Sequence, residues 1–136
     1  MKERINNLEI NEELIEKILP QICDKETSQD PERWSKENPL WGHCAVVSLV
    51  VQDYLGGELL RASLLSVKGF EHMRSHYWNQ LEDGKEIDFT KSQFGDKYPE
   101  DLQWELRTRE YVLSYQETAK RYELLKSRFL KLLQNV

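Results

Sequence analysis

The segment that most constrains the fold is an apolar run that begins at Cys44 and ends at Leu55. Drawn as a helix, it carries apolar side chains on nearly every side, and a helix of that kind is buried. Its β-branched residues would also suit a strand. A length of about three turns and the following Gly56-Gly57 pair, which offers a left-handed stop, favour the helix. We therefore predict a buried central helix over residues 44–55, with Cys44 in its first turn.

Helices are also predicted at both ends of the chain. Apolar side chains recur on one helical face of residues 10–23, where Asn11 suits the N-cap position. Pro20 is expected to kink or end this first helix. The C-terminal segment, residues 101–136, is predicted to be helical throughout, and Ser114-Tyr115-Gln116-Glu117 within it matches a capping box.

Strands are predicted directly after the central helix. Residues 58–67 read as one strand, and residues 75–81 and 85–90 read as a hairpin around Glu82-Asp83-Gly84. The polar segment 24–40, which precedes the central helix, is interpreted as a loop or a lid. These elements predict one α+β domain over residues 1–136, with the central helix packed on a small antiparallel sheet and covered by the N- and C-terminal helices.

The register of the hairpin decides whether His76 and Asp88 share a face of the sheet. A two-residue loop would put these side chains on opposite faces. A three-residue loop, with Gly84 left-handed at a bulge, pairs Leu81 with Lys85 and makes His76 and Asp88 diagonal neighbours. Only this second register gathers the apolar side chains of the hairpin on one face, and register follows the buried face. We therefore predict the three-residue loop.

Composition supports a single folded domain and argues against two classes of function. The chain of 136 residues has 39% hydrophobic and 32% charged residues, which indicates a modest core inside a charged surface. Its 4 Trp, 6 Tyr and 4 Phe argue against disorder. The net charge of −5 argues against a dedicated nucleic-acid-binding protein. No apolar run approaches the roughly 20 residues that a membrane span needs.

The cysteines and the N-terminal residues bear on the cellular compartment. Residues 1–6 contain no apolar stretch that resembles a signal peptide. Cys23 and Cys44 are therefore interpreted as free thiols in a reducing cytoplasm. We predict a cytoplasmic protein, monomeric or homodimeric, that needs no cofactor and contacts neither nucleic acid nor membrane.

Three residues form the strongest candidate for chemistry: Cys44 at a helix start, and His76 and Asp88 on consecutive strands. A helix N-terminus favours the thiolate, and a neighbouring imidazole can accept the thiol proton and later deliver it to a leaving group. A carboxylate on the other ring nitrogen fixes the tautomer and stabilises the imidazolium. The first N–H groups of the helix would serve a developing oxyanion.

The segments that carry these residues show a family resemblance. Trp41-Gly42-His43-Cys44, followed by Ser75-His76-Tyr77-Trp78-Asn79 and Gly84-Lys85-Glu86-Ile87-Asp88-Phe89-Thr90, resembles the transglutaminase-like branch of the papain-like thiol enzymes. With Val50-Val51-Gln52-Asp53-Tyr54-Leu55-Gly56-Gly57, the chain is more similar to the small bacterial YunG-like family of uncharacterised proteins, over most of residues 34–130. The resemblance implies a papain-like fold with Cys44 as nucleophile, His76 as base and Asp88 as its orienting group.

Five further residues are candidates for substrate binding or oxyanion stabilisation. Asn38 lies six residues before Cys44, where papain-like enzymes often carry a glutamine that donates to the oxyanion. Gln80 shares the predicted face of His76 and offers another polar contact. The remaining three candidates are residues that would line the pocket: Trp41, His43 and Trp78. For the tryptophans, simple packing is the more common role.

Two other functions compete with thiol catalysis. A papain-like scaffold without chemistry would act as a binding or interaction module, with Cys44 packed as a small apolar residue. Zinc binding would use His72 and His76 with Cys44 and His43, although four residues of extended chain span about 13 Å, too far for two ligands of one ion. We favour a thiol-dependent hydrolase or acyltransferase that acts on an amide or acyl bond of a small molecule, a peptide or an acyl compound, with no metal.

Overall fold

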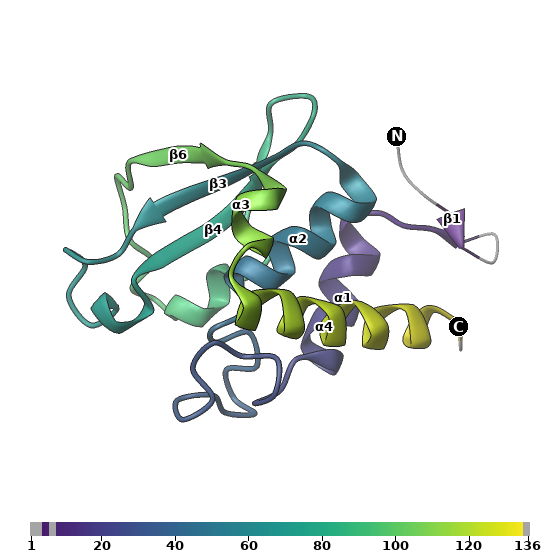
Figure 1. The fold of residues 1–136 in the computed structure, drawn as a ribbon, viewed down its shortest axis with the longest axis horizontal. Coiled ribbons are helices and arrows are strands. Elements are labelled where there is room, and N and C mark those ends of the chain that lie inside the picture. Colours follow the sequence, from purple (N-terminus) through teal and green to yellow (C-terminus); the bar gives the residue numbers. More distant parts are fainter. Residues whose placement is uncertain (1–3, 6–7, 135–136) are drawn as a thin grey trace.

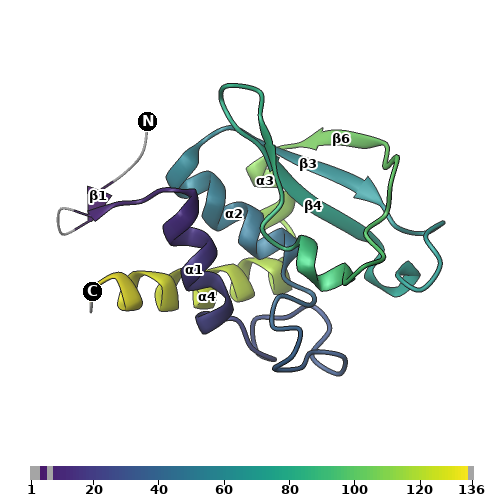
Figure 2. The same cartoon turned by 180° about the vertical axis from the view of Figure 1, so that it is seen from behind.

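The computed structural model describes residues 4–5 and 8–134 and shows a mixed α+β fold (Figure 1). A four-stranded antiparallel sheet of order β5-β4-β3-β6 lies on one side of α2, and α1 and α4 lie on the other (Figures 1 and 2). The predicted domain limits, 1–136, include residues 1–3, 6–7 and 135–136, which lie outside the described residues. The helices are α1 (Glu12–Ile22), α2 (Cys44–Leu55), α3 (Arg109–Leu113) and α4 (Gln116–Gln134).

The sheet strands are β3 (Glu58–Ser63), β4 (Ser75–Gln80), β5 (Glu86–Ile87) and β6 (Trp104–Arg107). A separate two-stranded pair joins β1 (Arg4–Ile5) to β2 (Leu8–Glu9). Two short 3₁₀ helices flank β4 and β5 along the chain, at Glu71–Met73 and Lys91–Phe94. The small antiparallel sheet agrees with the predicted fold class.

The central helix is confirmed with its predicted limits. Helix α2 runs from Cys44 to Leu55, is buried on almost every side and is followed by Gly56 at a φ of 73°. One side of α2 packs on the sheet, where Leu49 meets Leu59 of β3. The opposite side forms the main core with the two outer helices. An apolar helix of this kind needs neighbours on all sides, and the fold supplies them.

Helices α1 and α4 close the core on the side of α2 away from the sheet. Asn11 caps α1 as predicted, because its side-chain oxygen accepts a hydrogen bond of 2.9 Å from the Leu14 amide. Pro20 does not end the helix, which continues to Ile22. In α4 the buried side chains are Leu125, Phe129 and Leu133.

The hairpin has the predicted three-residue register. The Leu81 amide donates to the Lys85 carbonyl at 2.7 Å, and Asn79 pairs with Ile87. Gly84 adopts a φ of 91°, the left-handed conformation that this loop requires. The strands are shorter than predicted: β3 ends at Ser63 rather than residue 67, and β5 has only two residues.

The segment from residue 101 onward departs from the prediction. Residues 104–107 form strand β6, which pairs with β3, and helix begins only at Arg109. Trp104-Glu105-Leu106-Arg107 alternates apolar and charged residues, the pattern of a strand rather than a helix. Ser114 ends α3, and its hydroxyl donates to the Tyr111 carbonyl, so it is engaged in closing that helix.

Irregular segments cover the second face of the sheet. Leu60, Ala62 and Trp78 point to this face and pack with Leu102. The segment 24–40 is a loop of turns, as predicted, with one isolated bridge between Ser35 and Asn38. Among the described residues, none of the helices is both long and apolar enough to cross a membrane.

Candidate active site

Cys44 is the first residue of α2, and a tight turn delivers the chain to it. Gly42 has a φ of 77°, and a Cβ at this position would overlap the Ser28 hydroxyl. The Gly42 carbonyl accepts a hydrogen bond of 2.9 Å from the Gln29 amide, and the Ser28 hydroxyl donates to the Trp41 carbonyl at 2.7 Å. The loop 24–40 therefore holds the turn that positions the thiol.

His43 stabilises the same turn from inside the protein. Its side chain is fully buried, with Nε2 at 2.6 Å from the Thr27 hydroxyl and Nδ1 at 2.9 Å from the Trp41 carbonyl. Burial lowers the pKa of His43 to about 4. His43 occupies the N-cap position of α2 without making a side-chain cap hydrogen bond. The first amides of α2 are therefore not satisfied by a capping side chain.

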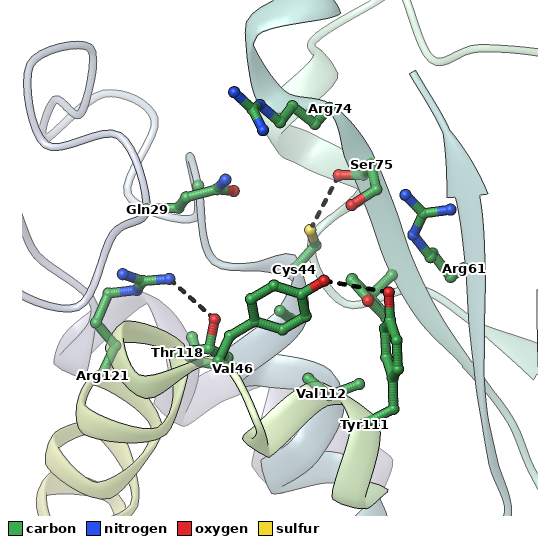
Figure 3. Close-up of a pocket in the computed structure, with 14 residues that line it drawn as sticks. Gln29, Cys44, Val46, Arg61, Arg74, Ser75, Tyr111, Val112, Thr118 and Arg121 are labelled. Carbon is green, nitrogen blue, oxygen red and sulfur yellow. Dashed lines mark hydrogen bonds between the residues drawn. The ribbon is translucent and has the colours of Figure 1, made fainter. Parts of the chain in front are cut away.

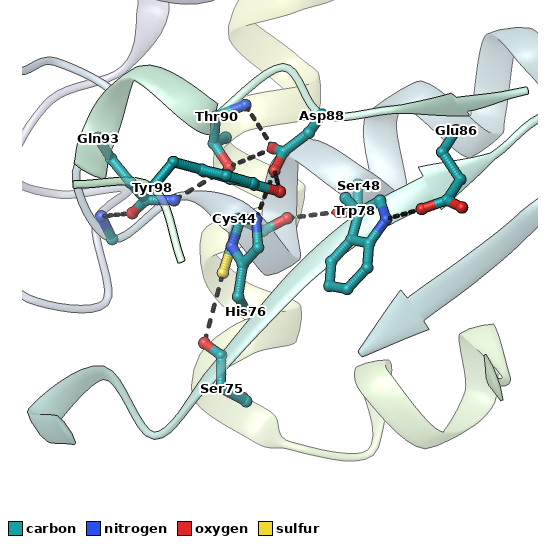
Figure 4. A network of polar contacts seen from close by, with 11 residues as sticks. Cys44, Ser48, Ser75, His76, Trp78, Glu86, Asp88, Thr90, Gln93 and Tyr98 are labelled. Carbon is teal, nitrogen blue, oxygen red and sulfur yellow. Dashed lines mark hydrogen bonds and ion pairs between the residues drawn. The ribbon is translucent and has the colours of Figure 1, made fainter. Parts of the chain in front are cut away.

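His76 and Asp88 form a buried, hydrogen-bonded pair (Figure 4). The Nε2 of His76 lies 2.6 Å from Oδ2 of Asp88. The carboxylate also accepts from the Tyr98 hydroxyl at 3.0 Å, and from the amide and hydroxyl of Thr90 at 3.1 and 3.2 Å. These donors hold the carboxylate in place on the far side of the imidazole from Cys44.

The Cys44 sulfur lies beside the imidazole of His76, on the side away from Asp88 (Figure 4). Burial opposes protonation of His76, but the hydrogen bond to Asp88 and the nearby Cys44 sulfur outweigh it and raise the pKa of His76 to about 9. Nδ1 of His76 is buried and has no hydrogen-bond partner among the described residues, while the Cys44 thiol donates weakly to the Ser75 carbonyl at 3.8 Å. We assign the Nε2 proton to the bond with Asp88, which leaves Nδ1 able to accept the thiol proton.

Aromatic rings enclose the imidazole and limit its motion. Trp78 stacks on His76 with ring centroids 5.3 Å apart, and its indole N–H donates to Glu86 at 2.9 Å. Phe94 and Tyr98 meet the ring edge-to-face at 4.9 and 6.2 Å. Aromatic rings therefore surround the imidazole, and the hydrogen bond to Asp88 fixes its Nε2.

A cavity of about 360 Å³ opens on the other side of Cys44 (Figure 3). Its walls include Arg61 of β3, Arg74 before β4, Arg121 of α4 and the tyrosines 111 and 115. The imidazole of His76 lies behind the thiol and is itself fully buried. Cys44 is therefore the residue at which the cavity meets the His76–Asp88 pair.

The other candidates predicted from the sequence lie away from this cavity. The Asn38 amide donates to the Gln93 carbonyl at 3.0 Å, which joins the 24–40 loop to the 3₁₀ helix Lys91–Phe94. Trp41 donates to Asp30 and stacks on His72 at 5.7 Å. Gln80 is at the end of β4, where its backbone pairs with Glu58 and Glu86. Of the five, Trp78 contacts the catalytic candidates directly.

Several site residues were missed by sequence reasoning. Thr90 had a local signal, because Asp88-Phe89-Thr90 is the spacing at which an Asp side chain accepts from the amide two residues later. Tyr98 and the three arginines of the cavity had none, since only tertiary folding brings their elements to Cys44. Gln93 also contributes, accepting from the Gly42 amide at 3.1 Å and donating to Thr90.

The residues considered for zinc have separate partners. His72 lies 3.4 Å from Asp30, His43 contacts Thr27, and His76 contacts Asp88. Within residues 4–5 and 8–134, no group of three or more His, Cys, Asp or Glu side chains is arranged to hold a metal ion.

Comparison with known proteins identifies the family. The sequence profile of the YunG protein family matches residues 11–134. The chain belongs to this family. It is similar to the "Uncharacterized protein YunG" of Bacillus subtilis (strain 168), with 30% identity over 82 residues that cover 60% of this chain and 62% of that relative. No solved structure shows significant similarity to the chain.

Proposed function

We propose that the protein is a thiol-dependent hydrolase or acyltransferase that acts on an amide or acyl bond through Cys44, His76 and Asp88. The observation that carries this proposal is the position of the thiol between a substrate-sized cavity and an imidazole that is bonded to a carboxylate. The order Cys, His, Asp, with the cysteine at a helix start and the histidine on a strand, supports a relationship to the transglutaminase-like branch of the papain-like enzymes.

The first half-reaction transfers the acyl group to the enzyme. The Cys44 thiol gives its proton to Nδ1 of His76, and the sulfur attacks the carbonyl carbon of the substrate. A C–S bond forms as the carbonyl π electrons move to oxygen. When the tetrahedral intermediate collapses, the bond to the leaving group breaks and His76 donates its proton to that group. Asp88 stabilises the imidazolium between these two transfers.

The second half-reaction releases the acyl group. His76 removes a proton from water, or from an amine acceptor, which attacks the thioester carbonyl. The C–S bond breaks, and the Cys44 sulfur recovers a proton from His76. Water yields a carboxylic acid and therefore hydrolysis, whereas an amine yields a new amide and therefore acyl transfer.

The start of α2 offers a place for the oxyanion. The first amides of the helix have no carbonyl one turn before them, and His43 provides no side-chain cap. Ala45 and Val46 line the cavity together with Cys44. Backbone amides at a helix N-terminus are donors of the kind that stabilise a tetrahedral intermediate.

The test compares the two cysteines of the native protein. Burial, with the neighbouring Asp24, raises the pKa of Cys23, so its thiolate is strongly disfavoured. We expect iodoacetamide to alkylate Cys44 much faster than Cys23 between pH 6 and 8, as measured by peptide mass spectrometry. We also expect p-nitrophenyl acetate to leave an acetyl group on Cys44, with a burst of nitrophenol.

Three variants identify the cause of the reactivity. Cys44→Ser removes the fast site and the acetyl adduct, whereas Cys23→Ser retains both. His76→Gln keeps a polar side chain but removes the base, and it is expected to slow both reactions. Equal and slow alkylation of both cysteines in the folded wild-type protein would overturn the proposal and favour a binding module without thiol chemistry.

A further inference from the structure

The cavity at Cys44 has a charge opposite to that of the protein. The chain carries a net charge of −5, yet the described residues that line this cavity include three arginines and no carboxylate. The arginines come from three separate elements: Arg61 from β3, Arg74 from the turn before β4, and Arg121 from α4. Figure 3 shows them on different sides of the Cys44 sulfur.

These arginines differ from the others in their partners. Arg33, Arg107, Arg109 and Arg128 each lie within 4 Å of a carboxylate, at distances between 2.7 and 3.2 Å. No such carboxylate partner is found for Arg61, Arg74 or Arg121 among the residues that the structure describes. Among Arg33, Arg61, Arg74, Arg107, Arg109, Arg121 and Arg128, the arginines with an ion pair in the described part of the chain lie outside the cavity, and those without one line it.

Arg121 shows the contrast most clearly. In the part of the chain that the structure describes, its Nε is buried without a hydrogen-bond partner, and its Nη2 donates to the Thr118 hydroxyl at 3.3 Å. Glu117 attracts it only at longer range, and burial lowers its pKa. A partly buried guanidinium without a carboxylate is costly to the folded protein, so the arrangement fits a ligand that supplies the missing charge.

The size of the cavity limits the ligand. A volume of about 360 Å³ is near the lower end of the range for small-molecule sites. The tyrosines 77, 111 and 115 form part of its wall, and the hydroxyls of Tyr111 and Tyr115 are hydrogen-bonded to each other at 3.2 Å. Aromatic walls with a few convergent cationic groups are suited to a compact organic anion.

We propose that the substrate is a small acyl compound that carries an oxyanion group, a carboxylate or a phosphate, close to the bond that Cys44 attacks. Arg61, Arg74 and Arg121 hold the oxyanion and thereby place the reacting carbonyl at the sulfur. This inference rests on the proposed function, because it names the substrate class of the same site. Guanidinium groups are the side chains best matched to the planar, bidentate recognition of such anions.

The test uses two alkylating agents of nearly equal size, iodoacetate and iodoacetamide, of which only the first is an anion. In both reactions the Cys44 sulfur displaces iodide, so that an S–C bond forms, a C–I bond breaks and the thiol proton passes to His76. The quantity measured is the ratio of the two rate constants at Cys44, compared with the same ratio for glutathione. We expect the ratio at Cys44 to exceed that of glutathione about tenfold at low salt and to fall as salt is added.

The variants Arg61→Gln, Arg74→Gln and Arg121→Gln are each expected to lower this ratio, and the triple variant is expected to bring it to the value of glutathione. The matched control is Arg33→Gln, an exposed arginine that pairs with Asp30 outside the cavity and should retain the wild-type ratio. Circular dichroism shows whether each variant is folded, and only folded variants are compared.

A second experiment distinguishes a carboxylate from a phosphate as the oxyanion group of the substrate. Succinate and inorganic phosphate are compared as protectants of Cys44 against iodoacetamide, with acetamide as the neutral control. Stronger protection by succinate indicates a carboxylate substrate, and stronger protection by phosphate indicates a phosphorylated one. Fast labelling by iodoacetamide with no preference for iodoacetate and no protection by either anion would overturn this inference and leave the thiol chemistry standing. Slow labelling by both reagents would overturn the proposed function itself.

Discussion

Two fully buried histidines, His43 next to Cys44 in the sequence and His76 beside its sulfur, have pKa values that are shifted in opposite directions. Burial lowers the pKa of His43 to about 4. His76 is also desolvated, but the hydrogen bond with Asp88 and the nearby Cys44 sulfur raise its pKa to about 9. His43 has a hydroxyl and a carbonyl as its side-chain hydrogen-bond partners, and the carboxylate of Asp24 acts on it without a hydrogen bond. The comparison shows that a nearby anionic partner, rather than burial, decides whether an imidazole next to Cys44 can hold a proton.

The same difference separates the structural role of His43 from the chemical role that we propose for His76. His43 stays neutral and fixes the turn that begins α2, and its neighbour Thr27 is buried with it. His76 has a carboxylate on one nitrogen and the thiol near the other, which is the arrangement needed to store a proton between two transfers. The two residues differ little in exposure, so exposure alone would not have told them apart.

The largest expected effect comes from removing the charge of Asp88. Asp88→Asn keeps the size of the side chain but loses the anion that stabilises the imidazolium, so His76 should come to resemble His43. We expect the rate at which iodoacetamide labels Cys44 near pH 7 to fall by about 100-fold. NMR titration of the imidazole should show the pKa of His76 moving down from about 9.

Stability against pH provides an independent check on this variant. Because the pKa of His76 is higher in the folded protein than in the unfolded chain, its contribution to stability is fully present below about pH 6.5 and is lost as the pH rises through about 9. The free energies of unfolding of wild-type protein and Asp88→Asn should therefore differ most at pH 6 and converge above pH 9. A difference that grows with pH would contradict the assigned role of Asp88.

The next largest effect is a loss of stability at acidic pH that we attribute to His43. Its pKa is lower in the folded protein than in the unfolded chain, so protons bind preferentially to the unfolded state, and stability falls as the pH drops from about 6.5 toward 4. The loss attributable to this residue should reach on the order of 3 kcal/mol. His43→Asn, which retains a donor near the position of Nδ1, should flatten this dependence in urea unfolding measured at several pH values.

The control for the acid experiment is Cys23→Ser, which leaves His43 and its partners in place. This variant should keep the full wild-type slope of stability against pH between 6.5 and 4. If His43→Asn showed the same slope as the wild type, the acid sensitivity would belong to other groups, and His43 would not be neutral for the reason given above.

How much of this site could be predicted depends on how local each signal is. Cys44 at a helix start and the register that puts His76 beside Asp88 followed from apolar patterns within about 15 residues, and the helix limits and register were both confirmed. The roles of these residues in catalysis remain predictions. Asp88 and Thr90 are two residues apart, so their contact also lay within reach of sequence reasoning.

The remaining features could not be predicted because they depend on packing between distant segments. Arg61 and Arg121 reach the same cavity from β3 and α4, although 60 residues of chain separate them. The position of His43 next to Cys44 predicts a pocket residue, whereas in the structure its side chain is buried and its Nε2 contacts the Thr27 hydroxyl. The sequence pattern predicts helix where strand β6 lies, because the four residues of the strand are too few to outweigh the helical pattern that follows them.

The smallest effect is expected at Trp78, and it tests whether stacking contributes to the difference between the two histidines. A tryptophan stacks on the ring of His76, whereas the ring nitrogens of His43 contact a hydroxyl and a carbonyl. Trp78→Phe keeps an aromatic ring at this position but loses the hydrogen bond of 2.9 Å from the indole N–H to Glu86. The free energy of unfolding should fall by about 1 kcal/mol, and the labelling rate of Cys44 should fall by a factor of about two.

A loss of labelling as large as that of Asp88→Asn would mean that the stacked ring, rather than the carboxylate, sets the protonation of His76. Because the carboxylate is held by Thr90 and Tyr98, and neither contact involves Trp78, we expect the pKa of His76 to stay high in this variant.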